Sequence, residues 1–598
     1  MRLHEMRRRS RNMRWPKQNA ETEYLKGFNL TGSAMDKKTF KSKVPMATYE
    51  DIRPLIRRIA DGDSSPILCT QPISELLWSS GSSGEPKLIP STKEALDRNL
   101  LFLSLVNVVM QIVADEGVAS SATFLVSWEV DNLYETEGCK LSRHVKGLDK
   151  GKRLNFVFTK SDKKTQGGIT VRPVSSNVFK SDTFKNRPTN VYTSPNEAIY
   201  CEDTFQSMYT QLLCGLYERE QVNRIETIFA STLVRVFKFL KLNWQQLTQD
   251  IRTGSLNPKV TDPSIRECMT RLMRPDRELA DYIGQECGKD NWEGIVTRIW
   301  PNAKYLGTIV TGTMAQYIPT LDFYNGGLPI ASMLYGSSEC YFGINLNPMC
   351  KPSEISYTFM PNKAYFEFLP HVPNSSEELT ESQLVDLVDV EIGKEYEVVV
   401  TTTAGLYRYR VGDIVQATGF YNSAPQFQFV MRKNVVLNID WDRTTETELQ
   451  AAVENASQFL LHKSETSVVD YTSFVDTTTN PDHYVIYWEL LQAKDLANSP
   501  SNDVLDKCCL VMEESFNWAY RRLRVLDKLI GPLEIRVVKN GTFEELMDYI
   551  VSKGGSMSQC KVPRSVGSKK PMLDLLESRV VSKHFSASLP HLSSEEGS

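Results

Sequence analysis

The sequence lacks the histidine and cysteine spacings of a metal centre. Its seven histidines form no close pair, and its eleven cysteines include no C-x-x-C motif. A zinc site or a histidine-based catalytic centre is therefore not expected. An odd number of scattered cysteines is typical of buried free thiols in a reducing compartment, so we expect a cytoplasmic protein.

Long apolar segments and a strong excess of charge are also missing. The most apolar run, Leu100–Ala114, is shorter than the ~18 residues of a membrane span. Ser104, Asn107 and Gln111 interrupt it on one helical face, which predicts a mostly buried helix that begins at a capping box, Ser91–Glu94. The net charge of −4 gives no reason to expect nucleic acid or an acidic membrane as a partner.

The composition is that of a globular protein with a large hydrophobic core: of the 598 residues, 41% are hydrophobic and 24% are charged. Short apolar runs bounded by turns alternate with longer helical periods, which predicts an α/β fold. The strand candidates are Arg153–Thr159, Lys304–Val310, Pro329–Gly336 and Glu395–Thr403, and the helix candidates are Glu226–Ile251 and Glu544–Gly554.

Three segments are predicted along the chain. Residues 1–20 are basic but have no apolar core of a secretion signal, which favours a solvated, disordered tail over a nuclear or RNA-binding segment. Near Leu437–Ala456 a strand gives way to a polar link and a helix. We therefore expect an N-terminal domain over residues 21–440 and a smaller α+β domain over 441–598.

A serine- and glycine-rich loop, WSSGSSGEPKLIP (Trp78–Pro90), lies between two apolar, strand-like runs. Glycines let a backbone approach a ligand closely, and N–H groups with serine hydroxyls can surround phosphate oxygens. Lys87 would supply a positive charge. Taken alone, the same run could also be a flexible linker.

Two further polar turns follow strands. In YGSSECYFG (Tyr335–Gly343), Glu339 stands beside two serines, a set of oxygen ligands that suits Mg²⁺, although a plain surface turn fits the pattern equally. In TTTAGLYRYRVGDIV (Thr401–Val415), Asp413 stands in a Gly-Asp turn, where its carboxylate could accept bonds from ribose hydroxyls. The alternative is a turn-forming aspartate in a hairpin.

The last two motifs are marked by basic residues. Arg432 and Lys433 end an alternating strand in QFQFVMRKN, where they could also be solvated edge charges. Lys561 lies in SMSQCKVPR, in a loop closed by Pro563, where an ordinary surface lysine is the alternative.

The order of these motifs resembles the adenylate-forming superfamily of acyl-CoA synthetases and luciferases. The detailed match is to the Gretchen Hagen 3 family of plant acyl acid–amido synthetases, closest to the auxin-conjugating branch. It runs from about Glu21 to Pro590. The segments that carry it are SSGSSGEPKLIP, TIVTGTMAQYIPTLDFY, YGSSECYFGINLNPMCKPSE, AGLYRYRVGDIVQATGFYNSAPQF and GPLEIRVV with GTFEELMDY.

The resemblance implies a fold and an activity. The fold would be a large N-terminal domain of β-sheets flanked by helices, with a β-barrel-like part, and a smaller mobile α+β C-terminal domain. The activity would be ATP- and Mg²⁺-dependent conjugation of an amino acid to a carboxylate hormone, with indole-3-acetic acid foremost, through an acyl adenylate; this would lower free auxin. The alternatives are the same chemistry on a benzoate- or jasmonate-type acid and a catalytically inactive binding homologue.

The resemblance also implies roles for individual residues. The catalytic residues would be Lys561, arriving from the mobile domain, and Glu339, which would hold Mg²⁺. Nucleotide-binding residues would be Ser79, Ser80, Gly81, Ser82, Ser83, Gly84, Lys87, Gly336, Ser337, Ser338, Glu339, Tyr341, Asp413 and Arg432. Acyl-substrate residues would be Arg98, Val174, Ser175, Phe179, Thr311, Gly312, Thr313 and Met314.

Three departures from the family pattern stand out. Ser82 replaces the usual threonine and keeps the hydroxyl. Ser175 and Phe179 stand where auxin-conjugating relatives usually have leucine and tyrosine, and serine in place of leucine removes apolar contact worth very roughly 1–3 kcal/mol. Residues 114–144 have no evident counterpart and are either a surface excursion or a gene-model artefact such as translated intron.

Overall fold

The computed structural model describes residues 17–30, 36–79, 87–111, 148–187, 189–372, 383–433, 435–439, 442–491, 500–553, 557, 561–567 and 569–592. These residues form two compact units. Unit 1 takes in the described residues up to 430 together with 557, and unit 2 takes in those of 431–553 and 561–592. The predicted disordered tail (for all but its last residues) and the atypical insertion 114–144 lie outside the described residues.

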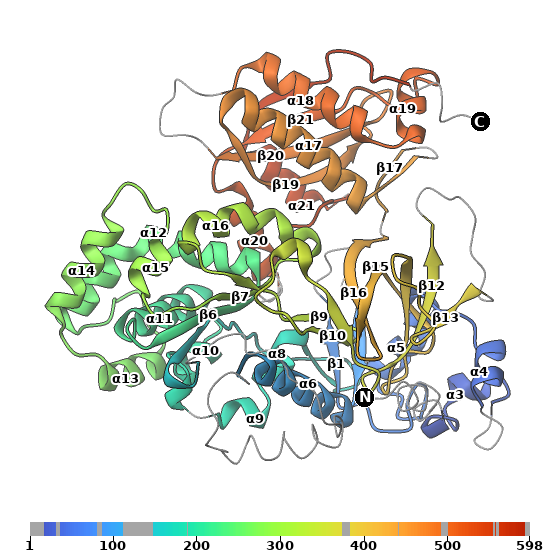
Figure 1. Cartoon of the computed structure of the whole chain (residues 1–598), viewed down its shortest axis with the longest axis horizontal. Helices are drawn as coiled ribbons and strands as arrows, with labels where there is room; N and C mark the ends of the chain where they lie inside the picture. The colour runs from blue at the N-terminus through green and yellow to red at the C-terminus, as the bar shows by residue number, and fades with distance from the viewer. Residues whose placement is uncertain are drawn as a thin grey trace. The chain divides into compact units, whose positions relative to one another are not determined.

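A parallel sheet flanked by helices forms one part of unit 1 (Figure 1). Its strands are β3 (Lys152–Asn155), β6 (Val222–Phe229), β7 (Leu306–Ile309) and β8 (Ile330–Ala331), and each neighbouring pair is parallel. Parallel strands need crossover connections. The connection from β6 to β7 contains α12 (Ala230–Thr253), α13 (Pro263–Leu272), α14 (Arg277–Cys287) and α15 (Ile295–Ile299).

A second sheet of unit 1 brings distant polar segments together. Strand β1 (Glu75–Trp78) pairs antiparallel with β2 (Leu88–Ser91) and parallel with β5 (Thr170–Pro173), and β5 also pairs with β4 (Lys163–Lys164). Because Trp78 lies opposite Leu88, the two ends of the serine–glycine loop meet. Strand β2 leads into α6 (Lys93–Gln111), and β5 leads directly into α8 (Val174–Phe179).

The third sheet of unit 1 has eight strands in the order β13-β12-β14-β15-β16-β11-β10-β9. Neighbouring strands are antiparallel to each other within the series β13-β12-β14-β15 and within the series β16-β11-β10-β9. Stacked and tilted aromatic rings fill its interior; Phe359, for example, lies 4.5 Å from Phe427, centroid to centroid. The bounds are β13 (Val385–Asp386), β12 (Tyr365–His371), β14 (Glu395–Thr401), β15 (Tyr409–Tyr421), β16 (Ala424–Arg432), β11 (Tyr357–Phe359), β10 (Tyr341–Asn345) and β9 (Leu334–Gly336).

Unit 2 is an α+β unit built on one mixed sheet. The sheet order is β19 (Ser467–Asp476), β20 (His483–Leu491), β21 (Glu534–Val538) and β22 (Val580–Phe585). Helices α17 (Glu446–Ser464) and α18 (Asn502–Ser515) bury Leu449, Val453 and Cys509 against Ile486 and Trp488 of the sheet (Figure 1). Thr445 caps α17 in a capping box with Glu448. The remaining elements are β17 (Val435–Ile439), β18 (Asp442–Thr445), α19 (Trp518–Val525), α20 (Thr542–Ser552) and α21 (Lys570–Glu577).

The α/β class and its division into a larger and a smaller part are confirmed, but three local predictions are wrong. Residues 226–229 belong to β6 and not to the following helix, because this buried run continues the parallel sheet. The expected strand Pro329–Gly336 is two strands, β8 and β9, of different sheets. Helix α6 has no capping box at Ser91, which belongs to β2; instead the Thr92 hydroxyl accepts from the Ala95 N–H at 3.2 Å.

The domain boundary predicted between residues 440 and 441 stays a prediction.

In the described part of the chain, no helix is both long enough and apolar enough to pass through a membrane.

Candidate functional site

The turn between β9 and β10 carries the predicted serine and glutamate residues. The Ser337 N–H donates to the Cys340 carbonyl at 2.8 Å, and the Glu339 N–H donates to the Ser337 hydroxyl at 3.3 Å. A tight hairpin turn therefore holds Ser337, Ser338 and Glu339 at the rim of the eight-stranded sheet.

Lys87 lies next to this turn, although it is far from it in the sequence. Its ammonium group donates to the Tyr409 hydroxyl at 3.2 Å, and that hydroxyl donates to Oε1 of Glu339 at 3.1 Å. The lysine Nζ and the glutamate Oε1 are 3.9 Å apart. The ring of Tyr49 also faces the ammonium, 5.5 Å from it. A cation and a carboxylate are thus held close together by one tyrosine hydroxyl.

The ends of the serine–glycine loop are fastened to each other. The Ser79 N–H donates to the Lys87 carbonyl at 2.9 Å, and the Lys87 N–H donates to the Ser79 hydroxyl at 2.8 Å. Residues 80–86 lie outside the described residues, so the predicted phosphate contacts of Ser80, Gly81, Ser82, Ser83 and Gly84 stay predictions.

A cleft with an empty volume of about 560 Å³, part of it open to solvent, adjoins the turn. Six of the predicted site residues line it: Arg98, Val174, Ser337, Ser338, Glu339 and Tyr341. The rest of its wall comes from β1, β2, α6, the β9–β10 turn and two loops: Leu77, Ile89, Pro90, Ser91, Ala95, Asn99, Cys340, Lys363 and Thr402–Ala404. The predicted nucleotide residues of the hairpin and two of the predicted acyl residues therefore share one cleft.

Arg98, on α6, is held firmly at this cleft. Its Nε and Nη2 both donate to Oε1 of Glu94, at 3.1 and 2.7 Å, and its Nη1 donates to the Asn362 carbonyl at 3.2 Å. The other oxygen of Glu94 accepts from the Gln71 amide. Two charge-assisted hydrogen bonds to one carboxylate oxygen, with the bond to the Asn362 carbonyl, hold the guanidinium of Arg98 in place.

Asp413 is close to the hairpin but not in a turn, so that part of the prediction is wrong. It lies inside β15 at a bulge, where three residues of β15 face one of β14 and Gly412 takes a φ of 82°. The Asp413 carboxylate is 1% exposed and accepts from the Tyr335 hydroxyl at 2.7 Å. Tyr335 directly precedes Gly336, so Asp413 is tied to the base of the β9–β10 hairpin.

The remaining predicted acyl residues lie on α8 and at the start of a 3₁₀ helix, outside the lining of the cleft. Ser175 is buried in α8, and the ring of Phe179 packs edge-on against Phe184 with centroids 4.9 Å apart. Thr311 precedes the 3₁₀ helix η4 (Gly312–Tyr317), and its hydroxyl is 3.5 Å from that of Tyr357. None of these residues appears among those that line the described cleft.

Two residues were missed in the sequence: Lys363, which lines the cleft, and Tyr409, which contacts the cleft residue Glu339. Tyr409 was part of the quoted YRYRVGD motif but was given no role, and Lys363, in the turn before β12, was not singled out at all. Lys363 is 8% exposed, and its Nζ donates to Oδ1 of Asn99 at 2.7 Å. Burial, with the nearby Arg98 charge adding to it, lowers the pKa of Lys363 to about 8.

Arg432 and Lys561 belong to unit 2. Arg432 is the last residue of β16, which confirms the predicted strand end. The segment after Lys561 is fixed to β19, because the Thr472 hydroxyl donates to the Pro563 carbonyl at 2.6 Å. Their predicted roles at the nucleotide stay predictions.

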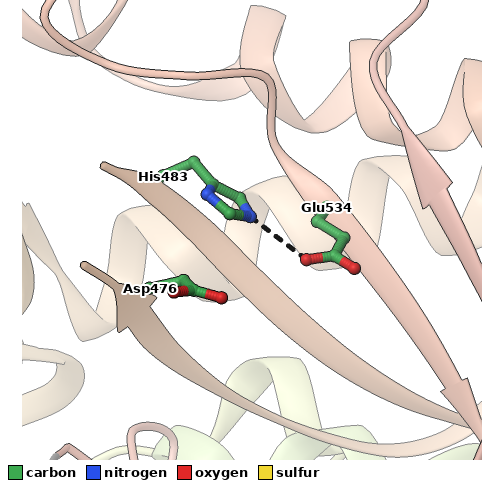
Figure 2. Close-up of side chains that lie close together, drawn as sticks. All are labelled: Asp476, His483 and Glu534. Carbon is green, nitrogen blue, oxygen red and sulfur yellow. Dashed lines mark hydrogen bonds and ion pairs between the residues drawn. The ribbon is translucent and has the colours of Figure 1, made fainter. Parts of the chain in front are cut away.

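Among the described residues of unit 2, three potential metal ligands lie buried together: Asp476, His483 and Glu534, on β19, β20 and β21 (Figure 2). Nε2 of His483 lies 3.1 Å from Oε2 of Glu534. The Arg536 guanidinium donates to both carboxylates, at 3.1 Å to Asp476 and 2.5 Å to Glu534. Because the Arg536 guanidinium already binds both carboxylates, we interpret the group as an ion-pair network that joins three strands.

Comparison with known proteins gives a consistent result along the chain. Family models match residues 16–141 and 127–330 (GH3 family N-terminal domain), 357–432 (GH3 family central domain) and 447–570 (GH3 family C-terminal domain). The chain is 57% identical to the probable indole-3-acetic acid-amido synthetase GH3.1 of Arabidopsis thaliana, over 96% of this chain and 91% of the relative.

A rice relative and a solved structure agree with these matches. The indole-3-acetic acid-amido synthetase GH3.8 of Oryza sativa subsp. indica is 55% identical over 96% of this chain and 90% of its own length. The solved GH3.15 acyl acid amido synthetase superposes with a TM-score of 0.84 at 44% identity, covering 99% of this chain and 97% of that one. The same enzyme has been solved in complex with 2,4-DB.

Proposed function

Because the chain belongs to the GH3 family, we propose that it is an ATP-dependent acyl acid–amido synthetase that joins an amino acid to indole-3-acetic acid and so lowers free auxin. The observation that carries this proposal is the identity of 57% over 96% of the chain with indole-3-acetic acid-amido synthetases. The cleft supports it, because residues suited to a nucleotide and residues suited to an organic acid line the same space.

In the first half-reaction, a carboxylate oxygen of the acid attacks the α-phosphorus of ATP and pyrophosphate leaves. An anion attacking a polyanion is opposed by charge repulsion, so cations must stabilise the transition state. Lys87, held by the Tyr409 hydroxyl, is one such cation beside the cleft. Lys561 is the second in this proposal, brought to the α-phosphate by movement of unit 2.

Glu339 and the serines beside it fit a Mg²⁺ ion that arrives with the nucleotide. Its carboxylate lines the cleft, and the neighbouring Ser337 and Ser338 also line it. One carboxylate is too few for an all-protein cage, but it suits Mg²⁺, which is usually bound by one or two carboxylates together with substrate phosphates. When bound, Mg²⁺ would offset phosphate charge. The ammonium of Lys87, 3.9 Å from Oε1, would turn from Glu339 toward the phosphates.

Other residues position the substrates. Asp413 holds the Tyr335 hydroxyl behind the hairpin and, in this proposal, exchanges that partner for the ribose hydroxyls. Arg98 and Val174 line the cleft and, in this proposal, contact the acyl acid. In the second half-reaction the neutral amine of the amino acid attacks the acyl carbon, the C–N bond forms, and the bond to AMP breaks.

A panel of acids tests the proposal and its alternatives together. Acid-dependent pyrophosphate release would be measured with indole-3-acetic acid, 2,4-DB, benzoates and jasmonates, followed by amino-acid-dependent AMP release with the best acid. The strongest release with indole-3-acetic acid is the expected result. Strongest release with a benzoate or a jasmonate would shift the assignment to that acid, and release with none would indicate an inactive binding homologue.

A further inference from the structure

A buried lysine on the wall of the cleft has no place in the chemistry described above. Lys363 is 8% exposed, and its ammonium lies beside the stacked rings of Phe102 and Tyr341, with Nζ 5.6 and 5.9 Å from their centroids. The Lys363 Nζ donates to Oδ1 of Asn99, the residue that follows Arg98 on α6. The ammonium group thus reaches the cleft beside the predicted acyl-binding residues.

Within the described chain, no carboxylate lies at ion-pair distance from this ammonium. The nearby acids are engaged elsewhere: Glu94 is bonded to Arg98 and Gln71, and Glu339 to Tyr409. Burying a cation without an opposite charge is costly, and the cost shows in the pKa of Lys363, lowered to about 8. An anion entering the cleft would remove much of this cost.

We propose that Lys363 pairs with the carboxylate of the acyl acid and holds it in the cleft before adenylation. The inference rests on the proposed function and adds to it a substrate-binding residue. The acid, and not an ATP phosphate, is favoured because Lys363 packs on α6 next to Arg98, on the same cleft wall. Apolar side chains for the body of an organic acid, Leu77, Ile89 and Val174, line the same cleft.

The test is direct binding of indole-3-acetic acid and, separately, of ATP to the full chain, without turnover. Lys363→Met keeps the length of the side chain and removes the charge, and we expect it to weaken acid binding about 10–100-fold. ATP binding should be unchanged. Lys93→Met is the matched control, because Lys93 is an exposed lysine on α6, the helix that Lys363 contacts, and does not line the cleft.

The pH dependence gives a second readout. Above about pH 8 wild-type Lys363 loses its proton, so acid binding should weaken from pH 7 to pH 9. Lys363→Arg stays charged and should bind the acid with a flat profile. The guanidinium of Arg98 and the carboxylate of Glu339 also line the cleft. Burial raises the pKa values of the neighbouring Cys340 and Tyr341 to about 12, so neither of these two groups titrates in this range.

The proposal is overturned if Lys363→Met binds the acid as tightly as wild type, or if only ATP binding is lost. Thermal unfolding separates binding from folding: Lys363→Met should not be less stable, since it removes a buried charge. These binding measurements are independent of turnover. Absence of pyrophosphate release with every acid would count against the proposed function, whereas equal acid binding by wild type and Lys363→Met would count against the role of Lys363.

Discussion

Replacing Tyr409 with phenylalanine removes the one hydroxyl group that joins Lys87 to Glu339 beside the cleft. That hydroxyl accepts from Lys87 at 3.2 Å and donates to Glu339 at 3.1 Å. The ring also faces the Lys87 ammonium at 5.8 Å, and phenylalanine keeps that contact. Tyr409 is fully buried, so the variant loses hydrogen bonds but little packing.

The expected loss follows from the charged partners. A hydrogen bond to a charged group contributes about 1.5–3 kcal/mol, and Lys87 is about one-third exposed, which favours the lower end for its bond. Without the hydroxyl, the ammonium of Lys87 and the carboxylate of Glu339, already 3.9 Å apart, can form a direct ion pair. In that pair the ammonium is no longer directed at the phosphates, and the carboxylate is no longer directed at Mg²⁺. We expect kcat/KM for ATP to fall about 10–100-fold.

The assay is acid-dependent pyrophosphate release over a range of ATP and Mg²⁺ concentrations. The loss should be partly recovered at high Mg²⁺, because the ion competes with Lys87 for Glu339. Tyr282→Phe is the control: it also removes a tyrosine hydroxyl bond, of 2.8 Å to the Arg298 carbonyl, away from the cleft lining. Unchanged ATP kinetics and Mg²⁺ dependence in Tyr409→Phe would refute a catalytic role for this arrangement.

Four further predictions can be checked separately. Glu339→Gln should abolish adenylation with the fold intact, since an amide binds Mg²⁺ weakly; near-normal release at limiting Mg²⁺ would argue against this role. Lys561→Ala should cut pyrophosphate release about 10²–10³-fold yet still form amide from a supplied acyl adenylate, and equal loss in both steps would point to a damaged fold. Ser175→Leu should lower KM for indole-3-acetate with little change in kcat; unchanged kinetics would remove α8 from the acyl wall. Although burial alone would raise the pKa of Glu534, hydrogen bonds from His483 and Arg536 lower it to about 2. The ionised carboxylate therefore stabilises the fold fully above about pH 4.5, and this contribution is lost as the pH falls toward 2. The free energy of unfolding, measured with urea, should fall by about 3 kcal/mol over this range in wild type but not in Glu534→Gln, and an identical pH profile in the variant would contradict the prediction.

The sequence was most informative where a motif is local. Gly336 to Glu339 were predicted as a polar turn after a strand, and they form the β9–β10 hairpin, because a glycine–serine cluster between two apolar runs admits little else. Ser79 and Lys87 were predicted at the ends of one loop, and β1 and β2 bring them together. Strand-end Arg432 was recognised for the same reason.

Features that depend on packing between distant segments were missed. Lys363 reads as an ordinary surface lysine, but its contact with Asn99 joins residues 264 positions apart, which no local pattern records. Asp413 follows a glycine and so reads as a turn residue, whereas the glycine serves a bulge inside a thirteen-residue strand. On α8, Val174 lines the cleft, whereas Phe179 packs on Phe184. Which residues of this helix reach the cleft depends on how the helix packs against the rest of unit 1.

The most direct test of the central claim is pyrophosphate release by the full chain with ATP, Mg²⁺ and indole-3-acetic acid. The proposed chemistry predicts release that requires the acid, followed by AMP and an indole-3-acetyl amide only when an amino acid is added. Release of pyrophosphate with no acid present, or none with any acid of the panel, would contradict the assignment of this chain as an acyl acid–amido synthetase.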